Sequence, residues 1–182
     1  MIRAFLAIPV PEEITRMLTG IQVGLDFGRI VPPQNFHITL VYLGEHPEPV
    51  LEDLHTLLDG AGGQPIEIRI EGLGVFGSAR PRSLFAEVAP NKGLGILRKR
   101  VRNAARGAGI ELEQGQYRPH VTLARFGNGL VGEDAAKLQA FISARISRVH
   151  GKFEAEMFHL YESRLGSEAP TYTPLADYPL TG

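Results

Sequence analysis

The chain has 182 residues, of which 43% are apolar and 21% charged, a composition typical of a soluble globular domain. Its formal net charge of −1 argues against a protein that grips long nucleic acids over its whole surface. The absence of cysteine excludes disulfides, zinc–thiolate sites, iron–sulfur clusters and a cysteine nucleophile. The sequence shows no secretory signal and no apolar stretch long enough to span a bilayer, so we expect a soluble cytoplasmic protein.

Hydrophobic periodicity predicts two successive sets of strands and helices. The first set comprises a strand over 2–8, a helix over 12–27, a strand over 36–43, a helix over 48–59 and a strand over 66–70. A segment rich in glycine and arginine, 72–82, is expected to form an exposed turn region. The second set comprises a strand over 83–88, a helix over 93–107, a connection over 109–118, a strand over 120–126, a helix over 133–147, a strand over 152–163 and an edge strand over 172–175.

The two sets indicate a duplicated unit. Each set carries one His-x-Thr-Leu segment in its middle strand, and the two histidines, His37 and His120, are 83 residues apart. We therefore predict an α+β fold in which two antiparallel sheets, flanked by helices, enclose a central cleft. The prediction is a single bilobal domain over 1–182, with approximate halves 1–82 and 83–182 that exchange their terminal strands.

The two His-x-Thr-Leu segments carry the candidate chemistry. Because side chains alternate along a strand, His37 and Thr39 share one face, and His120 and Thr122 share the corresponding face of the second strand. The residues between them are apolar and are expected to face the core. One such segment alone is weak evidence, because a single histidine in a strand is usually structural. Two copies at matching places favour a functional pair.

A pair of histidines suits the opening of a cyclic phosphate. One imidazole can take a proton from water while the other protonates the departing ribose oxygen, and both can do so near neutral pH. The hydroxyl groups of Thr39 and Thr122 can donate hydrogen bonds to the phosphate oxygens. This chemistry needs no cofactor, and the histidines, aspartates and glutamates show no convincing metal-ligand spacing.

The chain resembles the 2H phosphoesterases, and within them the RNA 2′,3′-cyclic phosphodiesterase family, also called 2′-5′ RNA ligases. The matching stretches span nearly the whole chain and lie at residues 3–8, 31–40, 43–44, 118–125 and 160–165. The resemblance implies a bilobal fold with both histidines in a central cleft. It also implies that the 3′ oxygen leaves, that His37 is the proton donor, and that His120 is the proton acceptor.

Further candidates are less well determined by the sequence. Arg125 matches a position that the family uses near phosphate, but simple alternation places it on the face opposite His120 unless the strand bends or bulges. Tyr42 and Phe126 are candidates for stacking on a base, with core packing as the alternative. Tyr161 and Arg164 match the family's closing strand, where structural roles are equally expected. The basic run of Arg98, Lys99, Arg100, Arg102 and Arg106 either guides an RNA tail or forms a solvated helix face.

Three functional hypotheses remain at this point. The leading one is hydrolysis of RNA 2′,3′-cyclic phosphate ends by a monomer that needs no protein partner and no membrane. The second is reversible joining of RNA ends through a 2′-5′ bond, which would use the same acid–base pair. The third is a non-catalytic module whose His and Thr side chains bind the phosphate of a nucleotide or RNA. Replacing either histidine separates the enzyme from the module, since only an enzyme has turnover to lose.

Overall fold

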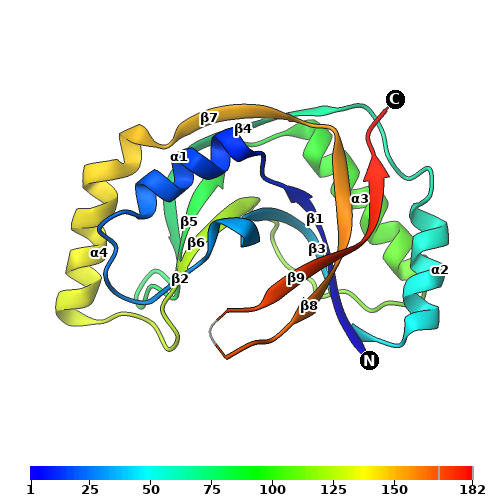
Figure 1. Ribbon diagram of the computed structural model, residues 1–182, viewed down its shortest axis with the longest axis horizontal. Helices are drawn as coiled ribbons and strands as arrows, with labels where there is room; N and C mark the ends of the chain where they lie inside the picture. Colours follow the sequence, from blue (N-terminus) through cyan, green and yellow to red (C-terminus); the bar gives the residue numbers. More distant parts are fainter. Residues whose placement is uncertain (168, 182) are drawn as a thin grey trace.

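In the computed structural model, which describes residues 1–167 and 169–181, the strands form two antiparallel sheets flanked by helices (Figure 1). The helices are α1 (Glu12–Gln22), α2 (Glu48–Leu58), α3 (Lys92–Gly107) and α4 (Gly132–Arg145), with short 3₁₀ helices at Pro33–Asn35 and Ile146–Arg148. The strands are β1 (Ile2–Pro9), β2 (Arg29–Ile30), β3 (His37–His46), β4 (Ile66–Phe76), β5 (Ser83–Val88), β6 (His120–Arg125), β7 (His150–Ala155), β8 (Met157–Arg164) and β9 (Thr171–Pro179). The predicted α+β class with two antiparallel sheets is confirmed.

The two sheets have matching strand orders. The first sheet has the order β3-β1-β8-β9, and the second has the order β2-β6-β5-β4-β7. Equivalent strands of the two halves therefore occupy equivalent places: β1 corresponds to β5, and β3 to β6. The strand that ends each half pairs with the strand that begins the other, since β4 lies beside β5 and β8 beside β1. Helices α2 and α3 cover the outer face of the first sheet, whereas α1 and α4 lie on the side of the second (Figure 1).

The apolar side chains of each sheet pack mainly beneath these helices. In β3 the buried positions include Ile38 and Leu40, and in β6 they include Val121 and Leu123, as the alternation predicted. Each motif strand thus has an apolar back and a polar front. Among the residues that the structure describes, no helix is long and apolar enough to cross a membrane.

The structure differs from the sequence prediction in several places, of which three change the course of the chain. The strand expected over 152–163 is two strands, β7 and β8, which lie in different sheets and meet at Glu156. The turn region expected over 72–82 begins later, because β4 continues to Phe76 after an irregularity near Gly72, whose φ is +86°. Helix α1 ends at Gln22, since Gly24 adopts a φ of +84° that a helix cannot continue.

Candidate active site

The two His-x-Thr-Leu segments have the same local structure. The first six residues of β3 and the six residues of β6 share one order of half-buried, buried and exposed side chains. The register against the neighbouring strand skips Leu40 in β3 and Leu123 in β6, so each strand bulges at the leucine of its motif. A bulge reverses the alternation. Tyr42 and Arg125, each five positions after its histidine, therefore return to the face that carries the histidine.

Each histidine ring is held through the same nitrogen. Nδ1 of His37 lies 2.7 Å from the carbonyl oxygen of Asn35, and Nδ1 of His120 lies 2.7 Å from that of Arg118. A carbonyl oxygen can only accept a hydrogen bond, so Nδ1–H donates in both rings. This arrangement leaves Nε2 of each ring as the nitrogen that can exchange a proton with a ligand.

Aromatic rings fix the orientation of both imidazoles. The His37 ring lies 4.9 Å from the Phe5 ring, with an angle of 38° between the planes, and 5.3 Å from the Tyr172 ring, edge to face. The His120 ring lies 5.0 Å from the Phe85 ring, and the nearby Phe76 ring also contacts it. Phe5 and Phe85 lie on the equivalent strands β1 and β5. The duplication therefore extends to the side chains that support each histidine.

Burial and neighbouring charges favour the neutral form of both imidazoles. Burial is the main cause that lowers the pKa of His37 to about 4, and the charges of Arg125 and His120 lower it further. Burial also lowers the pKa of His120, with smaller contributions in the same direction from the charges of Arg125 and Arg118. The charge of Arg125 therefore lowers the pKa of both imidazoles.

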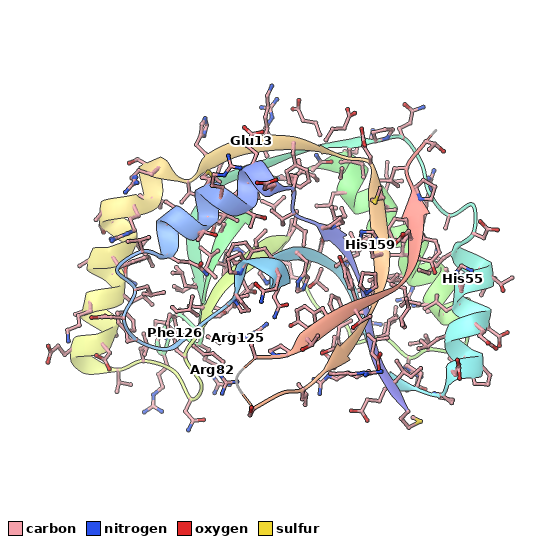
Figure 2. All side chains as sticks on the ribbon, viewed as in Figure 1. Glu13, His55, Arg82, Arg125, Phe126 and His159 are labelled. Atoms are coloured by element: carbon pink, nitrogen blue, oxygen red, sulfur yellow. The ribbon has the colours of Figure 1, made fainter. Side chains whose placement is uncertain are left out.

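A cavity of about 430 Å³ lies between the two sheets at this place. The predicted site residues that line it are His37, Thr39, Tyr42, Thr122 and Arg125. His120 is outside this lining, although it lies on the same face of β6 as Thr122, two residues away. Arg125, labelled in Figure 2, lines the cavity together with Leu165 and Pro170, which follow β8 and precede β9.

The described lining of the cavity is positively charged although the chain as a whole is nearly neutral. Three arginines, Arg3, Arg29 and Arg125, line it, and no aspartate or glutamate does so among the described residues. A second, larger hollow of about 1250 Å³ lies between the end of α2, the start of α3 and the C-terminal strand. It contains neither histidine motif, and its charged side chains are of both signs. The smaller cavity is therefore the candidate site.

The two aromatic candidates lie in different environments. The side chain of Tyr42 is 48% exposed, lines the cavity, and lies below the guanidinium of Arg3 at 5.4 Å. Phe126 requires a correction. It is 7% exposed, packs against Phe27 and directly over Gly28, and points away from the cavity (Figure 2). The bulge that returns Arg125 to the cleft face directs the next residue into the core, so Phe126 cannot stack on a base.

The remaining candidates have structural contacts. Tyr161 stacks on Phe5 at 5.1 Å and so supports the residue that packs on His37. Arg164 pairs with Glu162 at 3.1 Å and does not line the cavity. In the basic run of α3, the guanidinium groups of Arg98, Arg100 and Arg102 donate to the backbone carbonyls of Leu40, Gly62 and Glu113. Part of this run is thus occupied with contacts inside the protein.

Sequence reasoning missed several residues around the site. Arg3, Arg29 and Tyr172 line the cavity, and Gln22 is buried beside it at 9% exposure. Gln22 had a detectable signal, because it falls on the apolar stripe of α1 with Leu18 and Ile21. A polar residue in such a stripe needs a specific hydrogen-bond partner.

The chain is similar to a known family and to solved structures. A family model described as the 2′-5′ RNA ligase superfamily matches residues 11–164. A curated relative from Bacillus subtilis (strain 168), named RNA 2′,3′-cyclic phosphodiesterase, is 32% identical over 87% of this chain and 89% of its own length. A solved structure of a phosphoesterase covers 100% of this chain and 99% of its own, with a TM-score of 0.81 and 23% identity. A solved structure from Thermus thermophilus covers 99% of this chain and 98% of its own, with a TM-score of 0.80 and 28% identity.

Proposed function

The chain belongs to the 2′-5′ RNA ligase superfamily, and from this premise we propose that it hydrolyses 2′,3′-cyclic phosphate ends of RNA to 2′-phosphomonoesters. The observation that carries the proposal is the matched pair of histidines. His37 and His120 come from equivalent strands of two sheets, each is held through Nδ1, and each has Nε2 free for proton exchange. The Bacillus subtilis relative, which aligns over most of both chains, is named for this activity.

The proposed reaction is an in-line displacement at phosphorus. Nε2 of His120 accepts a proton from water as the water oxygen forms its bond to phosphorus. The bond between phosphorus and the 3′ oxygen breaks, and Nε2 of His37 gives a proton to that oxygen. The products are a 2′-phosphomonoester and a free 3′ hydroxyl. The assignment of donor and acceptor follows the pattern of the family, since the local structures of the two rings are nearly equivalent.

The lowered pKa of each histidine is consistent with a site in which the bound substrate raises the pKa of both rings. Without a ligand, burial and the Arg125 charge favour the neutral form of both rings. A phosphodiester in the cavity brings a negative charge next to both rings and raises the pKa of each. The acid form of His37 then becomes accessible when the substrate is bound, whereas His120 must be in its neutral form when water attacks.

Three side chains are placed to bind the phosphoryl oxygens. Thr39 and Thr122 lie two residues after the histidines on the same faces, and their hydroxyls can donate hydrogen bonds as charge develops on the oxygens. Arg125 can contact two oxygens with its planar guanidinium. All three line the cavity with His37.

The wider cavity suits the end of an RNA strand. Arg3 and Arg29 extend the positive surface beyond the proposed phosphate position, where further backbone phosphates of a single strand would pass. The exposed ring of Tyr42, on the same wall as Arg3, offers a face on which a base can stack. The proposal retains a cytoplasmic monomer that acts on RNA without a cofactor or an obligatory protein partner.

The proposed function predicts turnover of a short RNA with a 2′,3′-cyclic phosphate end in a buffer that contains EDTA. Because the proposed acid and base are side chains, the rate should be the same with and without the chelator. Separation of the products should show only the 2′-phosphomonoester, with a 2′-phosphate and a 3′-phosphate standard as markers. Activity that disappears in EDTA and returns with added metal, or a 3′-phosphate product, would contradict the mechanism.

The same assay separates the two other hypotheses. In the ligation reaction a ribose 5′ hydroxyl replaces water, so adding a second RNA with a free 5′ hydroxyl would give a longer product with a 2′-5′ bond. A phosphate-binding module would retain the RNA but leave its cyclic end intact. Neither outcome is favoured by a specific contact in the structure, so hydrolysis remains the proposal.

A further inference from the structure

The bulges at Leu40 and Leu123 create a structural requirement at the centre of the protein. A bulge takes one residue out of the regular ladder of backbone hydrogen bonds, and buried carbonyl groups need donors from elsewhere. Both leucines are buried, at 2% and 0% exposure. The position of Arg125 and Tyr42 in the cleft depends on these bulges, because regular alternation would turn both side chains away.

On β6, helix α1 supplies a side-chain donor to the bulge in addition to a backbone donor. The Nε2 atom of Gln22 donates to the carbonyl oxygens of Leu123, at 2.9 Å, and of Val31, at 2.8 Å. The backbone N–H of Val31 donates to the same Leu123 oxygen at 2.9 Å. The amide of Gln22 thus uses both of its hydrogens. It connects Val31, in the segment before the first motif, with Leu123, at the bulge of the second motif.

On β3, two side chains from the second half play the corresponding part. The hydroxyl of Tyr117 donates to the carbonyl oxygen of Thr39 at 3.0 Å, and Nε of Arg98 donates to that of Leu40 at 3.3 Å. The Arg98 guanidinium lies 4.2 Å from the centre of the Tyr117 ring, so the two donors support each other. Strand β3 is at the edge of its sheet, so its outer backbone carbonyls have no neighbouring strand in that sheet. The side chains of Tyr117 and Arg98 donate to two of these carbonyls instead.

The two sets of contacts are reciprocal. Gln22 lies on the first helix of the first half and holds the bulge of the second motif. Arg98 lies on the first helix of the second half and holds the bulge of the first motif. Tyr117 lies three residues before His120 and binds β3, the strand that carries His37. Gln22 likewise joins Val31, which precedes His37 in the chain, to β6, the strand that carries His120. The contacts therefore span the two sheets at the level of the cleft.

We propose that Gln22, Tyr117 and Arg98 are positioning residues that hold the two bulges and thereby set the orientation of the phosphate-binding and aromatic side chains in the cleft. None of the three lines the cavity, so they act through Arg125, Thr39 and Tyr42. The inference rests on the proposed function for its kinetic test. Its structural content, the dependence of Arg125 on Gln22, can also be measured through ligand binding.

The first test is a double-mutant cycle between Gln22 and Arg125. Gln22→Met keeps the length of the side chain but removes both donors, and it should lower kcat/KM by about 10- to 100-fold, the effect of a small misplacement at a reacting centre. On the background of Arg125→Ala, where the positioned group is absent, Gln22→Met should lower kcat/KM by no more than about twofold. An equal loss on both backgrounds would show that Gln22 does not act through Arg125.

The second test compares two Tyr→Phe variants, each of which removes one hydroxyl group. Tyr117→Phe removes the donor to Thr39 and should lower kcat by about tenfold with little change in KM. Tyr178→Phe is the control, because its hydroxyl also lies in a single hydrogen bond, 3.0 Å from Nδ1 of His55, far from the cleft. The control should lose a comparable amount of thermal stability and keep its kcat. Equal kcat values for the two variants would overturn the role of Tyr117.

The pair Arg98→Met and Arg100→Met extends this comparison. Both arginines lie on α3 and donate to a backbone carbonyl, but only Arg98 contacts a bulge. Arg98→Met should lower kcat by about tenfold, and Arg100→Met should leave it unchanged. A similar decrease in both variants would point to a general loss of helix packing and would contradict the proposal.

Binding of 2′-AMP separates failure of this inference from failure of the proposed function. If the wild-type chain does not open cyclic phosphates, the proposed function is wrong, but calorimetric titration with 2′-AMP still reports on Arg125. Gln22→Met should weaken 2′-AMP binding about tenfold in the wild-type background and leave it unchanged in Arg125→Ala. Unaltered binding in the single variant would overturn the inference whatever the catalytic result.

Discussion

Replacing either histidine by alanine is expected to lower kcat by roughly 10²- to 10⁴-fold, the usual contribution of one positioned proton transfer. His37→Ala removes the proposed donor to the 3′ oxygen, and His120→Ala removes the proposed acceptor for the proton of water. The two act in one step, so the double variant should lose much less than the product of the single losses. Single-turnover rates on an RNA with a cyclic phosphate end measure both effects.

The matched control for these substitutions is His55→Ala. His55 lies on α2 (Figure 2), outside the cavity, and its ring contacts Tyr178. This variant should keep full activity. The two site variants should still bind 2′-AMP, because Arg125 and the threonines remain in place. If His37→Ala or His120→Ala kept more than about a tenth of the wild-type rate, that histidine would not be a general acid or base in this reaction.

Loss of Arg125 should change both the rate and its pH dependence. Arg125→Ala is expected to lower kcat/KM by about 10²-fold, as for other donors that stabilise charge in a transition state. The wild-type profile of kcat/KM reports the free protein, in which the pKa of both histidines is lowered. Its maximum should therefore lie below pH 6.5, the ordinary pKa of histidine.

The direction of the shift follows from the sign of the charge. The Arg125 guanidinium opposes protonation of both imidazoles, so its removal raises the pKa of each. Both limbs of the bell-shaped profile, and its maximum, should move to higher pH in Arg125→Ala. Arg125→Lys keeps the charge but loses the planar guanidinium that can contact two oxygens. Its rate should lie between those of the wild type and Arg125→Ala, and its pH profile should not shift. A profile that stays in place in Arg125→Ala would show that this charge does not act on the histidines.

The parts of the site that depend on local alternation could be predicted from the sequence. His37 with Thr39, and His120 with Thr122, share a face because they are two residues apart in a strand, and no distant contact alters this. The repeat of the motif in two similar halves also indicated the two-sheet fold. Each of these inferences requires only the period of a strand and the order of the elements.

The parts that depend on pairing between strands could not be predicted. The bulges at Leu40 and Leu123 arise from the register with neighbouring strands, which alternation along one strand does not contain. They determine why Arg125 enters the cleft and why the adjacent Phe126 does not. The division of 152–163 between two sheets is hidden for a similar reason. Apolar and polar residues alternate in the sequence up to Met157, but the pairing partner changes at Glu156 and Met157 is exposed.

Long-range contacts of polar side chains were also beyond the sequence. Gln22 reaches Leu123 across 101 positions, and Tyr117 reaches Thr39 across 78. The sequence shows that Gln22 falls in an apolar stripe and so needs a partner, but it does not identify the partner. The basic run of α3 illustrates the converse, since Arg98 reads as a surface charge and instead binds a backbone carbonyl.

The central claim is that the imidazoles of the two halves act on one phosphoryl group. The most direct measurement is an NMR titration of the histidine ring signals with 2′-AMP, with His37→Ala and His120→Ala used to assign the signals. The account predicts that both rings respond with a single shared dissociation constant and that the pKa of each rises in the complex. Ring signals that respond with different dissociation constants, or a ring that does not respond at all, would contradict it.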